Sequence, residues 1–111
     1  MRETIAAKVE PTFRADIFIG GSVDAAREAC REFVMRGLCV SMSPCDFIYT
    51  GGVESGVRIG LINYPRFPKS PTEITEDALE LARFLIVRLH QSSASVVTDS
   101  NTTWLTRREV D

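Results

Sequence analysis

Residues 57–91, VRIGLINYPRFPKSPTEITEDALELARFLIVRLHQ, carry the strongest structural signals in the chain. The segment begins with alternating apolar residues, which indicates a strand with one buried face. A loop with two prolines follows. The Ser-Pro-Thr-Glu run from Ser70 then combines a capping serine, a proline at the first helical position and the glutamate of a capping box. Apolar residues recur every three or four positions from Ile74, which predicts a helix that continues to about Gln91.

The rest of the chain supplies four more strands and a second helix. Residues 13–20 alternate apolar and polar side chains and predict a strand, and the stripe over residues 23–36 predicts an amphipathic helix. Residues 38–50 predict a strand that Pro44 interrupts, because proline cannot donate to a ladder, which indicates a bulge or an edge position. A glycine-rich turn then leads into the strand at residues 57–64, which predicts an antiparallel hairpin. Short strands are expected at 94–98 and 102–106.

This order of elements predicts the fold class. Strand, helix, two strands, helix and strand form the split β-α-β (ferredoxin-like) pattern, β-α-β-β-α-β, of an α+β protein. We therefore expect an antiparallel sheet with two helices on one face, plus a short C-terminal strand. The domain organisation is predicted as an N-terminal arm at 1–12, a single α/β domain at 13–106 and a C-terminal tail at 107–111. The arm is either loose or holds an edge strand near residues 5–9.

Composition narrows the class of protein. The chain has 111 residues, of which 44% are hydrophobic and 25% charged, as in an ordinary single globular domain. Its net charge of -2 argues mildly against binding duplex nucleic acid through phosphates. No apolar run is long enough to span a membrane, and the N-terminus lacks the apolar core of a secretory signal. Cys30, Cys39 and Cys45 show no CxxC spacing, and His90 is the single histidine. We expect a cytoplasmic protein with reduced thiols, no metal ligand and no cofactor.

One face of the predicted sheet lacks a cover. Both helices lie on the opposite side, so side chains such as Phe18, Ile62 and Tyr64 would face water. A small sheet does not leave an apolar face exposed at low cost, and self-association is the commonest way to cover it. We therefore expect the partner of this chain to be another copy of itself, in a homo-oligomer.

The hairpin and the loop at residues 65–69, PRFPK, which we call the proline loop, offer the chemistry of a binding site for a small anionic ligand, plausibly a nucleotide. Aromatic rings stack on bases, and guanidinium groups hold phosphates by forked hydrogen bonds. Two prolines hold the segment between them in an extended shape. The expected ligand-binding residues are Tyr49, Arg58, Asn63, Tyr64, Arg66 and Phe67. The alternative is a rigid connecting loop in which Phe67 fills the core.

Other functions find less support in the sequence. Residues 17–21, IFIGG, are similar to the first-strand motif of RNA-recognition domains, in which an aromatic at the position of Phe18 stacks on a base. The third strand of that family carries aromatics where this chain has Val57 and Ile59. The turn before Ser22 could hold an anion at a helix N-terminus, or simply cap the helix. No acid/base pair or nucleophile motif is evident, so we predict no catalytic residue. An RNA-binding or structural assembly module is the runner-up, and a small enzyme is third.

Two stretches also resemble a group of known proteins. Residues 47–52, FIYTGG, and 60–68, GLINYPRFP, resemble small phage-encoded proteins of unassigned function, and are similar in kind to anti-defence "sponge" proteins. The resemblance implies a non-enzymatic oligomer that sequesters nucleotides, including cyclic ones, in pockets at subunit boundaries.

Overall fold

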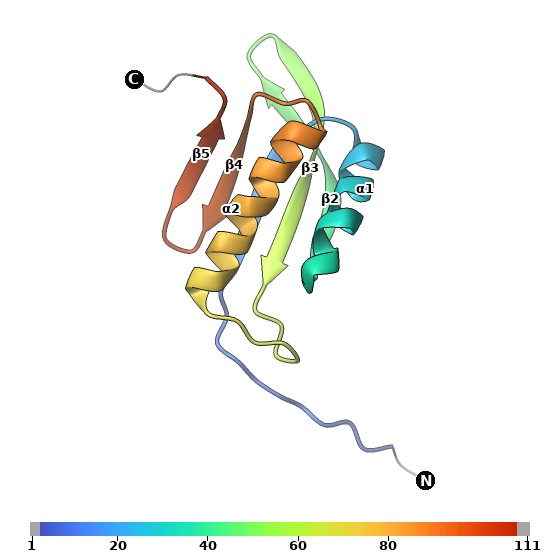
Figure 1. The fold of residues 1–111 in the computed structure, drawn as a ribbon, viewed down its shortest axis with the longest axis vertical. Coiled ribbons are helices and arrows are strands. Elements are labelled where there is room, and N and C mark those ends of the chain that lie inside the picture. Colours follow the sequence, from blue (N-terminus) through green and yellow to red (C-terminus); the bar gives the residue numbers. More distant parts are fainter. Residues whose placement is uncertain (1–2, 109–111) are drawn as a thin grey trace.

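The computed structural model describes residues 3–108, which form one antiparallel sheet with two helices on one face (Figure 1). The five strands are β1 (Arg14–Gly20), β2 (Ser41–Tyr49), β3 (Gly52–Ile62), β4 (Ser93–Thr98) and β5 (Thr102–Thr106). The helices are α1 (Val23–Phe33), the short 3₁₀ helix η1 (Val34–Arg36) and α2 (Pro71–Arg88).

The strands lie in the order β2-β3-β1-β4-β5, and every neighbouring pair is antiparallel. The first four strands confirm the predicted ferredoxin-like arrangement, and β5 is the predicted additional C-terminal strand. β2 and β5 form the two edges of the sheet in the part of the chain that the structure describes.

The start of α2 forms as its sequence predicts. The Ser70 hydroxyl accepts a hydrogen bond from the Glu73 backbone N–H, and the Glu73 carboxylate accepts one from the Ser70 backbone N–H, each at 3.1 Å. Pro71 is the first helical residue. The helix ends at Arg88, earlier than expected. His90 adopts a φ of 55°, a left-handed conformation that cannot continue the helix.

The hydrophobic core lies between the helices and the covered face of the sheet. Alternate residues of the two central strands point into it. They meet the apolar stripe of α2 and a shorter stripe on α1. The most completely buried large side chains are Ile17, Ile19, Val57, Ile59, Leu61, Leu81, Leu85 and Val96. Alternation along the strands and 3.6-residue periodicity along the helices therefore specify the same core.

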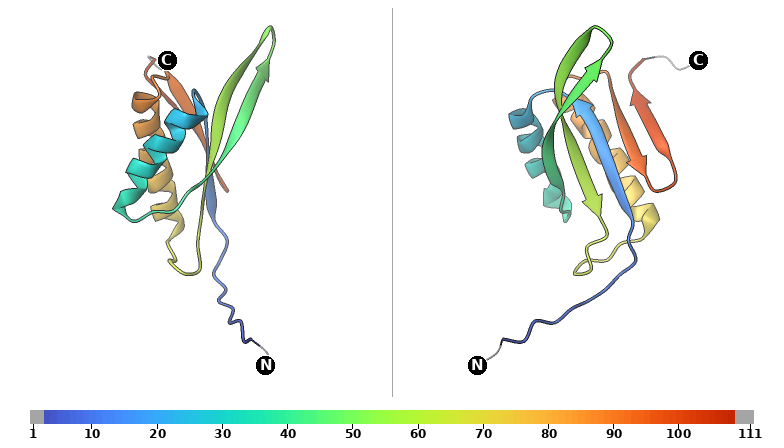
Figure 2. Two further views of the ribbon diagram at one scale, coloured as in Figure 1. Left: turned by 90° about the vertical axis from the view of Figure 1, so that its right-hand side faces the viewer. Right: turned by 180° about the vertical axis from the view of Figure 1, so that it is seen from behind.

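The β2–β3 hairpin differs from the prediction. Pro44 does not interrupt β2, because β2 is an edge strand and a missing N–H on its outer side breaks no ladder bond. The turn is tight, with Gly51 at a φ of 86°, so residues 52–56 are strand rather than loop. The hairpin consequently extends past the ends of the helices (Figure 2).

Residues 3–12 form neither helix nor strand and run away from the domain as an extended arm (Figures 1 and 2). Asn63 holds the arm at its base. Its backbone N–H donates to the Phe13 carbonyl at 3.0 Å, and its side chain donates to the Pro11 carbonyl at 2.8 Å. Residues 1–2 of the predicted arm and 109–111 of the predicted tail lie outside the described residues. No helix within residues 3–108 is long and apolar enough to cross a membrane.

Candidate functional site

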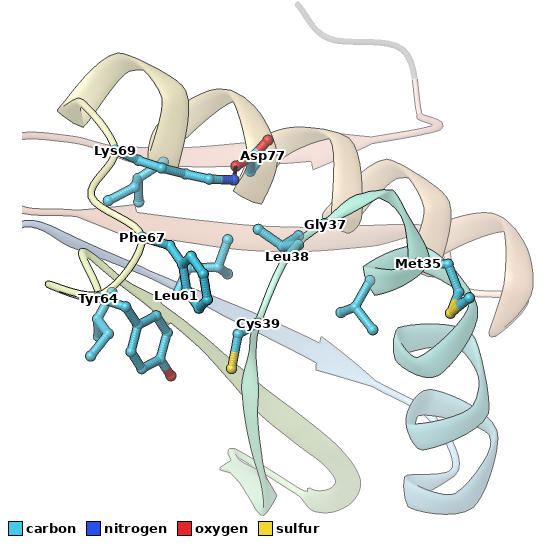
Figure 3. Close-up of a pocket in the computed structure, with 12 residues that line it drawn as sticks. Met35, Gly37, Leu38, Cys39, Leu61, Tyr64, Phe67, Lys69 and Asp77 are labelled. Atoms are coloured by element: carbon cyan, nitrogen blue, oxygen red, sulfur yellow. Dashed lines mark hydrogen bonds and ion pairs between the residues drawn. The ribbon is translucent and has the colours of Figure 1, made fainter.

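A cavity of about 460 Å³ opens at the end of the domain where β3 leaves the sheet (Figure 3). It lies between η1, the segment that follows η1, the end of β3, the proline loop and the first turns of α2. Aliphatic side chains line most of its wall, namely Val34, Met35, Leu38, Leu61, Ile62 and Ile74. Its volume falls in the range of small-molecule sites, which are mostly apolar with a few polar groups.

Two local features shape this cavity. Gly37 adopts a φ of 96° and turns the chain sharply after η1, which places Leu38 and Cys39 on the wall opposite the proline loop. On the other side, the Asn63 side chain accepts a hydrogen bond from the Lys69 backbone N–H at 2.8 Å. Asn63 is only 8% exposed, so this bond closes the base of the loop from Tyr64 to Pro68 in a sheltered position.

Aromatic rings from the proline loop form one side of the cavity. The Tyr64 phenol lies near the Cys39 thiol, and this neighbour, together with partial burial, raises the pKa of Tyr64 above its usual value. Phe67 remains 64% exposed although its ring borders the cavity. A large aromatic side chain that is held by prolines and left open to water is a ready surface for stacking a planar ligand.

A single ion pair forms the charged part of the wall. The Lys69 ammonium and the Asp77 carboxylate lie 2.8 Å apart, and each side chain is little more than a quarter exposed (Figure 3). Lys69 ends the proline loop and Asp77 lies on the second turn of α2. The pair offers one cationic and one anionic group side by side, which suits a ligand that carries both a carboxylate and an ammonium.

The structure brings only two of the six expected ligand-binding residues, Tyr64 and Phe67, to this cavity. Arg66 belongs to the same loop but places its guanidinium over the Phe67 ring, 5.3 Å from the centroid. Asn63 is buried and serves the loop and the arm, as described above. The other two lie elsewhere, and neither lines the cavity.

Those two residues, Tyr49 and Arg58, occupy the hairpin tip and the open face of the sheet. Tyr49 pairs with Gly52 beside the turn and is 57% exposed. Arg58 points to the open face, where its guanidinium lies 3.0 Å from the Asp16 carboxylate of β1. Within one copy, the six residues therefore do not lie around one cavity.

Sequence reasoning missed the residues that complete the cavity. The sequence predicts only a reduced thiol at Cys39 and no ligand-binding role for Lys69 or Asp77. A weak sequence signal for the ion pair existed, because Lys69 precedes the predicted helix start and Asp77 lies two turns into the helix, within reach of it. The meeting of Cys39 with Tyr64 had none, because it depends on how the segment after η1 packs against the loop.

Two further features bear on function. No group of three or more His, Cys, Asp or Glu side chains within residues 3–108 is arranged to hold a metal ion. The RNA-recognition alternative also loses support, because Val57 and Ile59 are 1% and 0% exposed and face the helices. Phe18 lies on the open face between Arg58 and Ser95, without the aromatic partners on the third strand that base stacking in that family requires.

Comparisons with known proteins add solved structures but no sequence relative. No protein-family model and no curated protein matches the chain. A phage SAM lyase in its apo state matches with a TM-score of 0.75 and 19% identity, covering 97% of this chain and 100% of the other. A phage SAM lyase in complex with S-methyl-5'-thioadenosine matches with a TM-score of 0.74 and 18% identity, covering 98% and 100%. CutA from Synechococcus elongatus PCC7942 matches with a TM-score of 0.49 and 16% identity, covering 91% of this chain and 82% of the other.

These comparisons correct the functional prediction. We expected a non-enzymatic oligomer that binds or sequesters a nucleotide, whereas two solved structures that match over nearly the whole chain are of a phage SAM lyase. The prediction of a nucleotide sponge is therefore wrong, and neither RNA binding nor a purely structural role fits better. At 18% and 19% identity the likeness itself shows a shared fold.

Proposed function

We propose that this chain is a lyase that cleaves S-adenosylmethionine (SAM) in the cavity bounded by Tyr64 and Phe67. The observation that supports the proposal is the match of the whole chain to a phage SAM lyase, including one with S-methyl-5'-thioadenosine bound. The cavity has the size and the largely apolar wall that such a ligand needs.

The named ligand identifies the bond that would break. S-Methyl-5'-thioadenosine keeps the adenosine, the sulfur and the methyl group of SAM, so the lost part is the four-carbon amino-acid chain. The carbon–sulfur bond to that chain breaks, its electron pair goes to sulfur, and the sulfonium becomes a neutral thioether. In a lyase reaction no water is added in this step. Either the carboxylate oxygen of the fragment bonds to the carbon that leaves sulfur, which closes a lactone with no proton transfer, or a basic side chain takes a proton from the adjacent carbon and the fragment leaves unsaturated.

The residues of the cavity can take distinct parts in this reaction. The Phe67 ring offers a stacking surface for the adenine, with Tyr64 beside it. Lys69 and Asp77 can receive the carboxylate and the ammonium of the amino-acid end, exchanging their mutual contact for contacts with the substrate. Both ends of SAM would then be held, with the sulfonium between them.

The aliphatic wall would contribute to the rate. Cleavage removes the positive charge of the sulfonium, so the transition state carries a weaker charge at sulfur than the substrate does. Moving a charge from water into an apolar surrounding costs less free energy when the charge is dispersed than when it is localised. An apolar site therefore favours the transition state over the substrate. Leu38, Leu61 and Ile74 line the cavity and would supply this surrounding.

The test is to incubate the purified protein with SAM and to follow S-methyl-5'-thioadenosine by liquid chromatography and mass spectrometry. A four-carbon product that initially lacks the mass of one water distinguishes a lyase from a hydrolase. Failure to form S-methyl-5'-thioadenosine at millimolar SAM would overturn the proposal.

Substitutions then test the place of the reaction. Phe67→Ala should raise KM about tenfold, the equivalent of about 1.4 kcal/mol, if its ring stacks on adenine. Asp77→Asn keeps the shape of the side chain and should weaken substrate binding through loss of the charge. Val87→Ala, on the exposed side of α2 at 60% exposure, is the matched control and should change neither parameter.

We also propose that the chain self-associates through the open face of the sheet and acts against host defence. Ile62 and Trp104 are 46% and 53% exposed on that face, which suits a second copy. The mass in solution tests this part. Because SAM is a methyl donor, its destruction in an infected cell would oppose methylation-dependent defence, and both lyase neighbours are phage proteins.

A further inference from the structure

We propose that the arm, residues 3–12, of one copy adds as a strand to the outer edge of β5 in a second copy. This inference concerns assembly and does not depend on the proposed lyase activity. It rests on three observations. The arm has the pattern of a strand but no partner strand, the β5 edge of the sheet is unprotected, and the base of the arm points away from β5 of the same copy.

The arm has the pattern of a strand. Ile5, Ala7 and Val9 alternate with Thr4, Ala6 and Lys8, so an extended backbone presents one apolar and one mixed face. Ile5 and Val9 are each 88% exposed. Within the described part of the chain, no backbone hydrogen bond joins residues 3–10 to another segment. An extended segment of this kind satisfies its backbone groups best by adding to a sheet.

The outer edge of β5 is the better acceptor of the two sheet edges. β2 contains Pro44, which lacks the N–H that a new strand would need and so protects that edge. β5 has the sequence TTWLT, without proline or charge, and its outer side faces no other strand among residues 3–108. Its Trp104 is 53% exposed. Neutral edges of this composition normally have a cover.

The arm of the same chain points the wrong way. Asn63 follows β3, and it binds the carbonyls of Pro11 and Phe13 on the β3 side of β1. β5 lies on the opposite side of β1, beyond β4 (Figure 2). To reach its own β5, the arm would have to break both hydrogen bonds and cross beneath two strands. A second copy meets no such obstacle.

Side-chain chemistry favours an antiparallel arrangement. It would place the N-terminal end of the arm, with Glu3, beside the C-terminal end of β5, which the exposed Arg108 follows. Ile5 and Val9 could then share a face with Trp104. Pairs of aromatic and β-branched side chains on neighbouring strands are among the more stabilising ones.

Trp104 reports on this contact directly, because it is the single tryptophan of the chain. The test variant is Ile5→Lys/Val9→Lys, which charges the apolar face of the arm. The matched control is Thr4→Lys/Ala6→Lys, which adds the same charge to the other face. The test variant should shift the Trp104 emission to the red and make it more accessible to acrylamide, while the control keeps the emission of the natural chain.

A mixing experiment assigns the arm to its copy. One chain carries Ile5→Lys/Val9→Lys and keeps Trp104, and the other carries Trp104→Phe and keeps its arm. Mixing them should shift the emission back to the blue, because an intact arm then covers the tryptophan of the other chain. The proposal is overturned if mixing restores nothing, if test and control variants behave alike, or if Trp104 is protected by the arm in a monomer.

Discussion

The two halves of β3 belong to one continuous strand and have opposite surroundings. Residues 57–62 lie beneath the helices, and Val57, Ile59 and Leu61 are at most 2% exposed. Residues 52–56 belong to the same strand, yet Val53 is 64% exposed and its direct partner on β2, Ile48, is 82% exposed. Membership of one strand thus does not determine burial, which depends on what lies over each part of the strand. The exposed half is longer than the core of one copy requires, which is expected of a surface that meets a partner.

The largest expected effect comes from truncating a residue in the covered half. Ile59→Ala should lower the free energy of unfolding by about 2–5 kcal/mol, because it removes a fully buried side chain and leaves a cavity. Val53→Ala, on the exposed half of the same strand, should change it by less than about 0.5 kcal/mol. Urea unfolding of both variants measures the difference. Equal costs would show that the two halves do not differ as described.

Gly56 marks the boundary between the halves and should come next. A β-carbon there would collide with the Phe47 ring and with two backbone atoms, the Ile19 carbonyl oxygen and the Gly20 α-carbon, which cannot move without disturbing the sheet. Gly56→Ala should therefore cost about 1–3 kcal/mol of stability. Gly60→Ala is the control, because its β-carbon would meet mainly the Ser41 hydroxyl, which can rotate away. A smaller loss at Gly56 than at Gly60 in thermal unfolding would contradict this account.

Asn63, just after the covered half, should give a smaller effect. Asn63→Ala leaves the Lys69 N–H and the Pro11 carbonyl without their partner, at a cost of about 1–2 kcal/mol in unfolding free energy. Hydrogen exchange should speed up at Lys69 and over the proline loop, while β1 and the rest of β3 keep their protection. Uniform acceleration over the whole sheet would argue against a local role.

The last effect vanishes near neutral pH and concerns the Cys30 thiol of α1. Burial raises the pKa of Cys30 from 9.0 to about 11, so the folded chain binds its proton more tightly than the unfolded chain. Its contribution to stability is complete below pH 9 and is lost as the pH rises through 11. Cys30→Ala should flatten this alkaline loss in urea titrations. Cys45→Ala should keep it, and the reverse outcome would refute the assignment.

The order and type of the elements could be predicted from the sequence because their signals are local. The capping box at Ser70 acts within one turn of helix, and the alternation of β1 needs no distant partner. The hairpin was less predictable. Pro44 left a bulge and an edge position both open, and only the order of the strands, which is a tertiary property, shows that β2 lies at the edge and runs through Pro44 unbroken.

The candidate site was predictable in part, for the same reason. Tyr64 and Phe67 were expected because prolines fix their loop. Cys39 and Asp77 reach that loop only through the packing of η1 and α2, and no spacing in the sequence records it. Arg58 was expected to bind an anionic ligand, but Asp16 on the neighbouring strand already supplies its counter-charge.

The Asn63 amide joins two parts of the molecule that have so far been treated separately. Its nitrogen holds the arm at Pro11, and its oxygen holds Lys69, whose ammonium faces Asp77 in the cavity wall. Arm and cavity thus share one rigid planar group as a mechanical link. Thermodynamic reciprocity then sets a condition on the whole molecule: if docking of the arm changes the affinity of the cavity for its ligand, the ligand changes the docking of the arm by the same factor.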